Sequence, residues 1–330
     1  MFPTMPLLRS LVFLAGHVAT KMPSLRDSRL TRQRLGLRRC SAAFSPATTI
    51  RKRQSTGAVQ NLAAEAKAAF SPKECRALLV RSYMSDQWIF FPCQIGEHRA
   101  SILFDHGIRD SIDEAPRLFL KVRAAFKSPR PDGLPTSEEF QQLSKLEDAL
   151  QALVQEKKSI YVGRVAVEGH HHFYIYTAES EAVWSLGLDR LGAQHDYPLG
   201  YVLKADESHD GYWKELFPTD DDWQVIQDLR VIETLEKEGD DGSASRCIDH
   251  LAYFPSYPAA QEFSEWAKGQ GYGSFSIEGA DDNKFRVRFS HEGSVRLDDI
   301  SSHTIALRRK ASELEGDYDG WETPICKSSA

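Results

Sequence analysis

The sequence predicts an α+β protein with two ferredoxin-like-type domains, each an antiparallel sheet with helices on one face, after a disordered basic N-terminal segment. Two observations support this fold class. Short segments rich in β-branched and aromatic residues alternate with amphipathic helices, and in the second half of the chain their order is β-α-β-β-α-β. The composition also changes abruptly near residue 84. We therefore expect three regions, 1–83, 84–217 and 218–330.

The overall composition restricts the class of protein. The chain has 330 residues, of which 41% are apolar and 27% charged, enough for two globular cores. No apolar run approaches the roughly 20 residues that a membrane-spanning helix needs, so we expect no membrane partner. The five cysteines are scattered and form no Cys-x-x-Cys pair. This pattern disfavours a disulfide framework or a zinc site and fits a reducing compartment.

Charge is divided unevenly along the chain. Residues 1–83 contain 15 Lys and Arg against 3 Asp and Glu, whereas residues 84–330 contain 26 against 44. Acidic surfaces repel phosphate backbones and attract cationic proteins. We therefore expect the folded part to avoid direct contact with nucleic acid and to bind a basic protein partner.

The N-terminal region 1–83 allows three interpretations. Its Arg-rich stretch RDSRLTRQRLGLRRC is typical of an organelle transit peptide. A secretory signal is disfavoured because Arg9 interrupts the apolar run. A translation start placed too early, with Met84 as the true start in place of Met1, explains the change of composition best. A true start at Met84 predicts a cytoplasmic location, whereas a transit peptide predicts a location in an organelle. A helix is expected over 58–81.

In the middle region, segment composition predicts strands at 87–95, 99–108 and 117–126, a helix at 137–157, a hairpin at 159–177, a helix at 179–188 and a strand at 199–206. Thr136 and Glu139 predict a capping box that opens the first helix, after a loop rich in Pro and Gly. The hairpin is expected to turn at Glu168-Gly169. Helices set between antiparallel strands favour α+β.

Two stretches of the middle region are similar to metal sites. In His170-His171-His172, only His170 and His172 share a face of a strand, and two ligands do not make a zinc site. We expect an exposed strand edge there. The stretch 206–211 begins like a calcium loop, but Phe217 stands where the bidentate Glu belongs. We expect a polar turn.

Four stretches of the middle region carry a family resemblance: QWIFFP, DGLPTSEE, YVGRVAVEGHHHFYIY and DGYWKELFP. They resemble the family catalogued as domain of unknown function 695. The resemblance spans most of this region and implies no function.

The C-terminal region is expected to begin with a helix over 223–239, because Asp220, Asp221 and Asp222 complement the dipole of its first turn and Gly239 ends it. Its apolar face is predicted to consist of Val225, Leu229, Ile232 and Leu235. The elements predicted next are a strand at 245–256, a helix at 259–271, strands at 272–279 and 284–291, a helix at 298–316 and a strand at 317–325. After the leading helix, this order is the split βαβ pattern.

The stretch GDYDGWET, residues 316–323, is rich in acidic and aromatic residues. Asp317 and Asp319 share a strand face, and paired carboxylates can hold Mg²⁺ or act in acid–base catalysis. We favour a different interpretation, in which Tyr318 packs inward on the opposite face and the acids face solvent or a partner. Trp321 is expected in the core, with an anchor at an interface as the alternative.

The C-terminal region also carries a family resemblance, over about 222–330. The stretches RCIDHLAYFPS, AQEF before GQGY, LDDI and above all GDYDGWET resemble the regulator of ribonuclease E activity B family. This resemblance implies a small, acidic, cytoplasmic bacterial protein without enzymatic activity. It also implies binding to endoribonuclease E and restraint of its RNA cleavage. The charge of this region agrees with the acidic character of that family, since residues 222–330 contain 21 Asp and Glu but only 12 Lys and Arg.

We therefore expect a non-enzymatic acidic regulator that binds an endoribonuclease of the E type and modulates RNA degradation, with no cofactor and no metal. The residues expected to contact this partner are Asp249, His250, Asp317, Asp319, Gly320, Trp321 and Glu322. One alternative is a generic protein-interaction module without a ribonuclease partner. Another is a metal-dependent hydrolase that uses Asp317 and Asp319 with His170 and His172.

Overall fold

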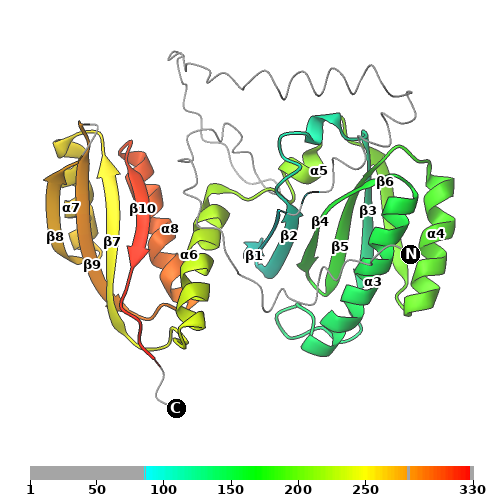
Figure 1. The fold of residues 1–330 in the computed structure, drawn as a ribbon, viewed down its shortest axis with the longest axis horizontal. Coiled ribbons are helices and arrows are strands. Elements are labelled where there is room, and N and C mark those ends of the chain that lie inside the picture. The colour runs from blue at the N-terminus through cyan, green and yellow to red at the C-terminus, as the bar shows by residue number, and fades with distance from the viewer. Residues whose placement is uncertain (1–84, 86, 281–282, 328–330) are drawn as a thin grey trace, which may run out of the picture. The chain divides into compact units, whose positions relative to one another are not determined.

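The computed structural model of this chain describes residues 85, 87–280 and 283–327 (Figure 1). These residues form two compact units, a middle domain that ends at Phe217 and a C-terminal domain that begins at Pro218. The helix expected over 58–81 lies outside the described residues. Within the described part of the chain, no helix is both long and apolar enough to cross a membrane.

The middle domain is built on a sheet of six antiparallel strands in the order β1-β2-β4-β5-β3-β6. The strands are β1 Trp88–Ile95, β2 His98–Asp105, β3 Leu118–Ala125, β4 Ile160–Val167, β5 His170–Thr177 and β6 Leu199–Ala205. The helices are α3 Ser137–Glu156, α4 Glu181–His195 and the short α5 Asp210–Trp213, with a 3₁₀ turn at Ile112–Glu114. From β3 to β6 the chain follows the split βαβ pattern, and the β1–β2 hairpin extends the sheet beside β4. The expected α+β architecture is confirmed.

Helices α3 and α4 cover one face of this sheet. Leu143, Leu146 and Leu150 of α3 are fully buried together with Trp184 and Leu188 of α4. Helix α4 continues beyond the expected end, past two glycines that lower helix propensity. The second of them is explained by packing, because a Cβ atom at Gly192 would lie 2.7 Å from the carbonyl oxygen of Tyr197.

The N-terminus of α3 departs from the expected capping box. The Thr136 hydroxyl accepts a hydrogen bond from the backbone N–H of Glu139, as predicted (3.3 Å). The Glu139 carboxylate, however, does not return to Thr136. It accepts from the backbone N–H of Ser128 at 2.8 Å, from that of Lys127, and from the Tyr197 hydroxyl at 3.2 Å. The buried carboxylate therefore fixes the preceding loop, and that half of the prediction is wrong.

The histidine stretch lies on β5, which is a central strand between β4 and β3, so the expected exposed edge is wrong. His171 is 1% exposed and packs edge-on against the rings of Phe126 and Phe173. Neither of its ring nitrogens has a hydrogen-bond partner, and burial holds its pKa well below the usual value. His170 and His172 share the opposite face, as the alternation predicts, with ring centroids 5.9 Å apart.

The stretch that begins like a calcium loop is a polar turn, as expected. The Asp206 carboxylate accepts from the backbone N–H groups of Asp210 and Gly211, at 2.8 and 2.9 Å, and from the Tyr176 hydroxyl at 2.8 Å. These bonds cap the start of α5, so the Asp206 carboxylate has a structural role.

The C-terminal domain has a four-stranded antiparallel sheet in the order β10-β7-β9-β8. Its elements are α6 Asp220–Lys237, β7 Arg246–Phe254, α7 Tyr257–Gly269, β8 Gly273–Gly279, β9 Phe285–Gly293, α8 Leu297–Glu313 and β10 Asp317–Glu322. Helices α7 and α8 lie on the same face of the sheet, and α6 packs against α8 (Figure 1). From β7 onward this is the split βαβ pattern, with the same strand order as the core of the middle domain. The other face of the sheet carries no described helix.

Helix α6 begins at Asp220, three residues before the expected start. Part of its expected apolar face packs into the domain, since Leu235 is buried and Ile232 lies against the same cluster. Thr219 and Asp222 form a complete capping box, which fixes the start of the helix. Ile226 is buried, whereas Val225 and Leu229 of the expected apolar face are only partly so. The buried stripe also contains a carboxylate, Asp228, which is 0% exposed.

Candidate functional site

Two adjacent strands bring most of the expected contact residues together. Strand β10 pairs with β7 in a register that places Trp321 opposite His250 and Glu322 opposite Asp249. Asp317 pairs with Tyr253, farther along the same two strands. A hollow of about 160 Å³ is lined by residues of β7, β9 and β10: Asp249, His250, Leu251, Arg288, Asp319, Gly320, Trp321 and Glu322. Six of the seven predicted residues therefore line one site.

A β-bulge in β10 shapes this site. Tyr318 pairs with Ala252 and Gly320 pairs with Leu251, which leaves Asp319 as an extra residue. Gly320 has a φ of +132°, a conformation that only glycine adopts without strain. Because of the bulge, Tyr318 and Trp321 both point into the core although they are three positions apart, at 5% and 9% exposure. Simple alternation would have placed Trp321 on the outer face.

Trp321 therefore belongs to the core, as one of the two expectations held. It packs in a cluster with Ile248, Val295 and Ile300, and its indole N–H donates to Oδ1 of Asp228 at 2.9 Å. The side chain forms part of the lining of the hollow and does not project from it. Its main role is to fix β10 against the helices.

Asp228 is the anchor of this arrangement, and the sequence analysis missed it. Its carboxylate accepts four hydrogen bonds: from the Trp321 indole, from Gln224 Nε2 at 3.0 Å, from the Ser301 hydroxyl at 2.9 Å and from the Thr304 hydroxyl at 2.6 Å. The bonds join α6, α8 and β10. Burial still raises the pKa of Asp228, because those donors offset only part of the lost hydration.

The outer surface of β10 and β7 is acidic. Asp317, Asp319 and Glu322 are exposed, and Asp249 is partly exposed. Strand β9 carries cations beside this surface, and the guanidinium of Arg288 lies 3.4 Å from the Glu322 carboxylate. Both side chains of that ion pair are mostly in solvent, so a competing cation can replace the arginine at little cost.

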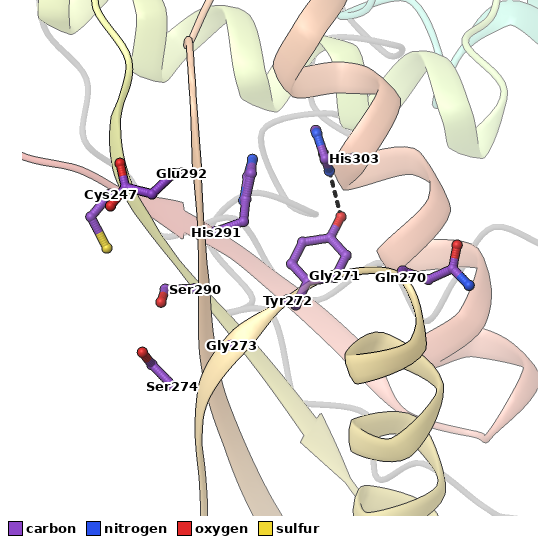
Figure 2. Close-up of a pocket in the computed structure, with 10 residues that line it drawn as sticks. All are labelled: Cys247, Gln270, Gly271, Tyr272, Gly273, Ser274, Ser290, His291, Glu292 and His303. Carbon is purple, nitrogen blue, oxygen red and sulfur yellow. Dashed lines mark hydrogen bonds between the residues drawn. The ribbon is translucent and has the colours of Figure 1, made fainter.

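Three histidines meet on the inner side of the sheet: His250 of β7, His291 of β9 and His303 of α8. His250 Nδ1 lies 2.7 Å from the Tyr318 hydroxyl, and His250 Nε2 lies 2.8 Å from Nδ1 of His291. The His291 ring stacks on that of His303 at 4.1 Å, and His303 hydrogen bonds with the Tyr272 hydroxyl at 2.6 Å (Figure 2). These contacts make His250 a hydrogen-bonded residue of the domain interior.

The environment of this cluster keeps its histidines neutral. Burial, reinforced by the neighbouring histidines, lowers the pKa of His250 to about 3. Burial, followed by the charge of His303, lowers the pKa of His291 to about 4. Burial also lowers the pKa of His303. A larger hollow of about 530 Å³ opens beside His291 and His303 (Figure 2).

A buried ion pair holds the segment that follows β10. Asp240 and Arg246 are 1% and 5% exposed and form a bidentate pair. Asp240 also accepts from the backbone N–H of Cys326 at 2.7 Å, and Arg246 donates to the carbonyl oxygen of Pro324 at 3.3 Å. The hydrogen bonds from Arg246 hold the pKa of Asp240 far below its usual value. The pair thereby fixes the end of the acidic strand.

The residues of the hydrolase alternative are divided between the two units. Asp317 and Asp319 belong to the C-terminal domain, and His170 and His172 to the middle domain. Within the described ranges, no group of three His, Cys, Asp or Glu side chains is placed to hold a metal ion. The glycine-rich stretch GQGYG, residues 269–273, stands at the end of α7 and not at the start of a helix.

Each of the two domains matches a known protein family. Residues 226–323 match the family described as regulator of ribonuclease activity B, and residues 86–217 match a family of unknown function, domain 695. Both resemblances expected from the sequence are thus confirmed, in the expected order. The C-terminal match indicates a regulator of ribonuclease activity. No curated protein matches the chain.

Solved structures show only distant likeness. An unknown protein from Galdieria sulphuraria is similar at 8% identity and a TM-score of 0.18, over 63% of this chain and 99% of that one. A putative glycine cleavage system transcriptional repressor is similar at 12% identity and a TM-score of 0.20, over 63% and 98%.

Proposed function

We propose that this protein, whose C-terminal domain matches regulators of ribonuclease activity, binds an endoribonuclease of the E type in the cytoplasm and restrains its cleavage of RNA. The protein contributes a docking surface and no bond-making chemistry. We define that surface, the β10–β7 face, as Asp249, Asp317, Asp319 and Glu322.

One observation carries this proposal. The bulge at Asp319 and Gly320 turns the aromatic side chains of β10 into the core and leaves its carboxylates on the outer face beside Asp249. Such a surface suits a cationic segment, and an endoribonuclease segment that handles RNA must itself be cationic. Opposite charges on the two partners accelerate association and make the complex sensitive to salt.

The chemistry of the neighbouring groups also favours docking over catalysis. A general base needs a partner that tunes its pKa and a fixed position relative to a substrate. The two most deeply buried carboxylates of this domain are instead saturated by structural contacts: Asp228 has four donors, and Asp240 has Arg246 and two backbone N–H groups. The exposed carboxylates are at the surface, where they can pair with a cation.

Charge reversal on the β10–β7 face is expected to weaken ribonuclease binding. The triple variant Asp249→Lys, Asp319→Lys, Glu322→Lys should bind an E-type endoribonuclease at least tenfold less tightly, about 1.4 kcal/mol. Most of the loss should appear in the association rate at low salt. The measurement is the affinity and association rate of the purified partners, together with the rate of RNA cleavage with and without the protein.

A matched control keeps the net charge equal. Glu233, Glu236 and Glu238 are exposed on or just after α6, and their triple replacement by Lys changes the charge by the same amount. This control should bind and restrain cleavage like the wild type. Equal losses of affinity in both variants would show that net charge alone causes the effect. If the variant of the β10–β7 face binds as tightly as the wild type, the assigned surface is refuted. If the wild type binds no such endoribonuclease, the generic interaction module replaces this proposal.

A further inference from the structure

The charges of the middle domain are separated between its two layers. Helices α3 and α4 carry seven Asp and Glu but only Lys145 and Arg190. The adjacent strands β5, β3 and β6 carry no Asp or Glu, three Lys and Arg, and three His. A domain that is acidic on average thus has a sheet without a single acid in three neighbouring strands.

The strand register directs the cations to one face. Arg123 pairs with His172 of β5 and with Gly200 of β6, whereas Lys121 pairs with Tyr174. Paired residues in an antiparallel sheet point to the same side. Since His171 and Phe173, the alternate residues of β5, point toward the helices, these cations point away from α3 and α4.

This surface, the β5–β3–β6 face, comprises His170, His172, Lys121, Arg123, Val202 and Lys204. Arg123 and Lys204 are exposed, and Val202 between them is 59% exposed. Lys121 is held at 2.7 Å by Glu215, the acid that approaches this face from the segment after α5. His170 and His172 are partly exposed beside Arg123.

We propose that the β5–β3–β6 face binds single-stranded RNA. Lys121 and Arg123 are two residues apart on one strand, about 7 Å, so they can meet successive phosphates of an extended chain when a phosphate replaces Glu215 as the partner of the Lys121 amine. The imidazoles and Val202 offer flat and apolar surfaces on which unpaired bases can lie. The segment with α5 covers one end of this side of the sheet, over Phe119 and Tyr176, and leaves the end with Arg123 and Val202 exposed. Side chains on the strands of a split βαβ sheet are an established platform for single-stranded RNA.

An acidic protein is the other occupant that the charge would suit, and the geometry favours it less. An acidic segment needs only the cations, whereas the imidazole pair and exposed Val202 add contacts that a nucleobase uses. The expectation that the folded part avoids nucleic acid rested on its average charge. That average conceals the separation of acids and bases between the two layers.

Direct binding of a short labelled RNA tests the proposal. The full-length protein should increase the anisotropy of unstructured oligouridine and oligoadenosine at low salt. Because residues 1–83 are also basic, the difference between wild type and variant is the measurement that isolates this face. The double variant Arg123→Glu, Lys204→Glu loses two phosphate contacts, so it should bind at least tenfold less tightly. Its plot of the logarithm of affinity against the logarithm of salt concentration should be shallower by about 1.4.

The control variant exchanges two cations of the helical layer. Lys145→Glu, Arg190→Glu changes the net charge equally, and both residues are exposed on α3 and α4. It should bind RNA like the wild type. No RNA binding by the wild type, or equal losses in both variants, would overturn the proposal, as would binding of an acidic polyglutamate peptide in preference to RNA. Ribonuclease binding should be unchanged in both variants, which separates this test from that of the C-terminal domain.

Discussion

Replacing Asp228 by alanine is expected to destabilise the C-terminal domain by about 3–5 kcal/mol, which will unfold much of it at physiological temperature. The carboxylate is fully buried and satisfies donors from Gln224, Ser301, Thr304 and Trp321. Alanine leaves those donors without an acceptor and removes the link between β10 and the helices. Urea unfolding of the full-length protein, followed by hydrogen exchange in β7 and β9, measures the loss.

Two further variants make this prediction specific. Asp228→Asn keeps the volume but turns two acceptors into one acceptor and one donor, so it should destabilise the domain less than alanine does. Asp249→Ala removes an acid of the same type from the surface and should change stability by no more than about 0.5 kcal/mol. Similar stability of Asp228→Ala and the wild type would show that the network does not hold the domain together.

Acidification is expected to destabilise the C-terminal domain well above the pH at which its carboxylates protonate. The folded state holds His250 and His291 at pKa values of about 3 and 4, whereas the unfolded chain binds protons at about 6.5. The unfolded state therefore takes up more protons below pH 6.5. Stability is fully present above that pH and is lost as the pH falls toward 4. At pH 5 each of these two histidines costs about 2 kcal/mol.

The contacts among His250, His291 and His303 explain why these histidines resist protonation. A single proton lies between the facing nitrogens of His250 and His291, and protonation of both rings would set two N–H groups against each other. A charged His291 would also lie 4.1 Å from the ring of His303. Urea unfolding between pH 7 and 5 measures the slope of stability with pH. His291→Gln should lower this slope by about one proton, and an unchanged slope in this variant would contradict the expected link between folding and protonation.

The sequence predicts the topology well because that information is local. Gly169 at the β4–β5 turn, Thr136 and Thr219 before their helices, and the alternation in β7 each act within a few residues. Two successive split βαβ units follow from the order of such segments. The predicted contact residues on β7 and β10 also come together, since both strands belong to one such unit.

What the sequence does not predict depends on contacts between distant segments. The core position expected for Trp321 is correct, but alternation along β10 does not account for it. Only the pairing of β10 with β7 shows that the bulge at Asp319 turns Trp321 inward. In the sequence, Asp228 is an ordinary polar residue of an amphipathic helix, because its partners Ser301 and Trp321 are distant in the chain. His291 and His303 give no signal, because the cluster with His250 assembles residues from β9, α8 and β7.

The most direct test of the central claim is to map the contact surface in the complex with an E-type endoribonuclease by hydrogen–deuterium exchange. The account predicts protection of β10 and β7, around Asp249, Asp319 and Glu322, with α7 and α8 unchanged. The protection should disappear in the triple lysine variant. Protection confined to the helical face, or a complex that forms without any change in β10 and β7, would contradict the claim that this acidic face is the docking surface.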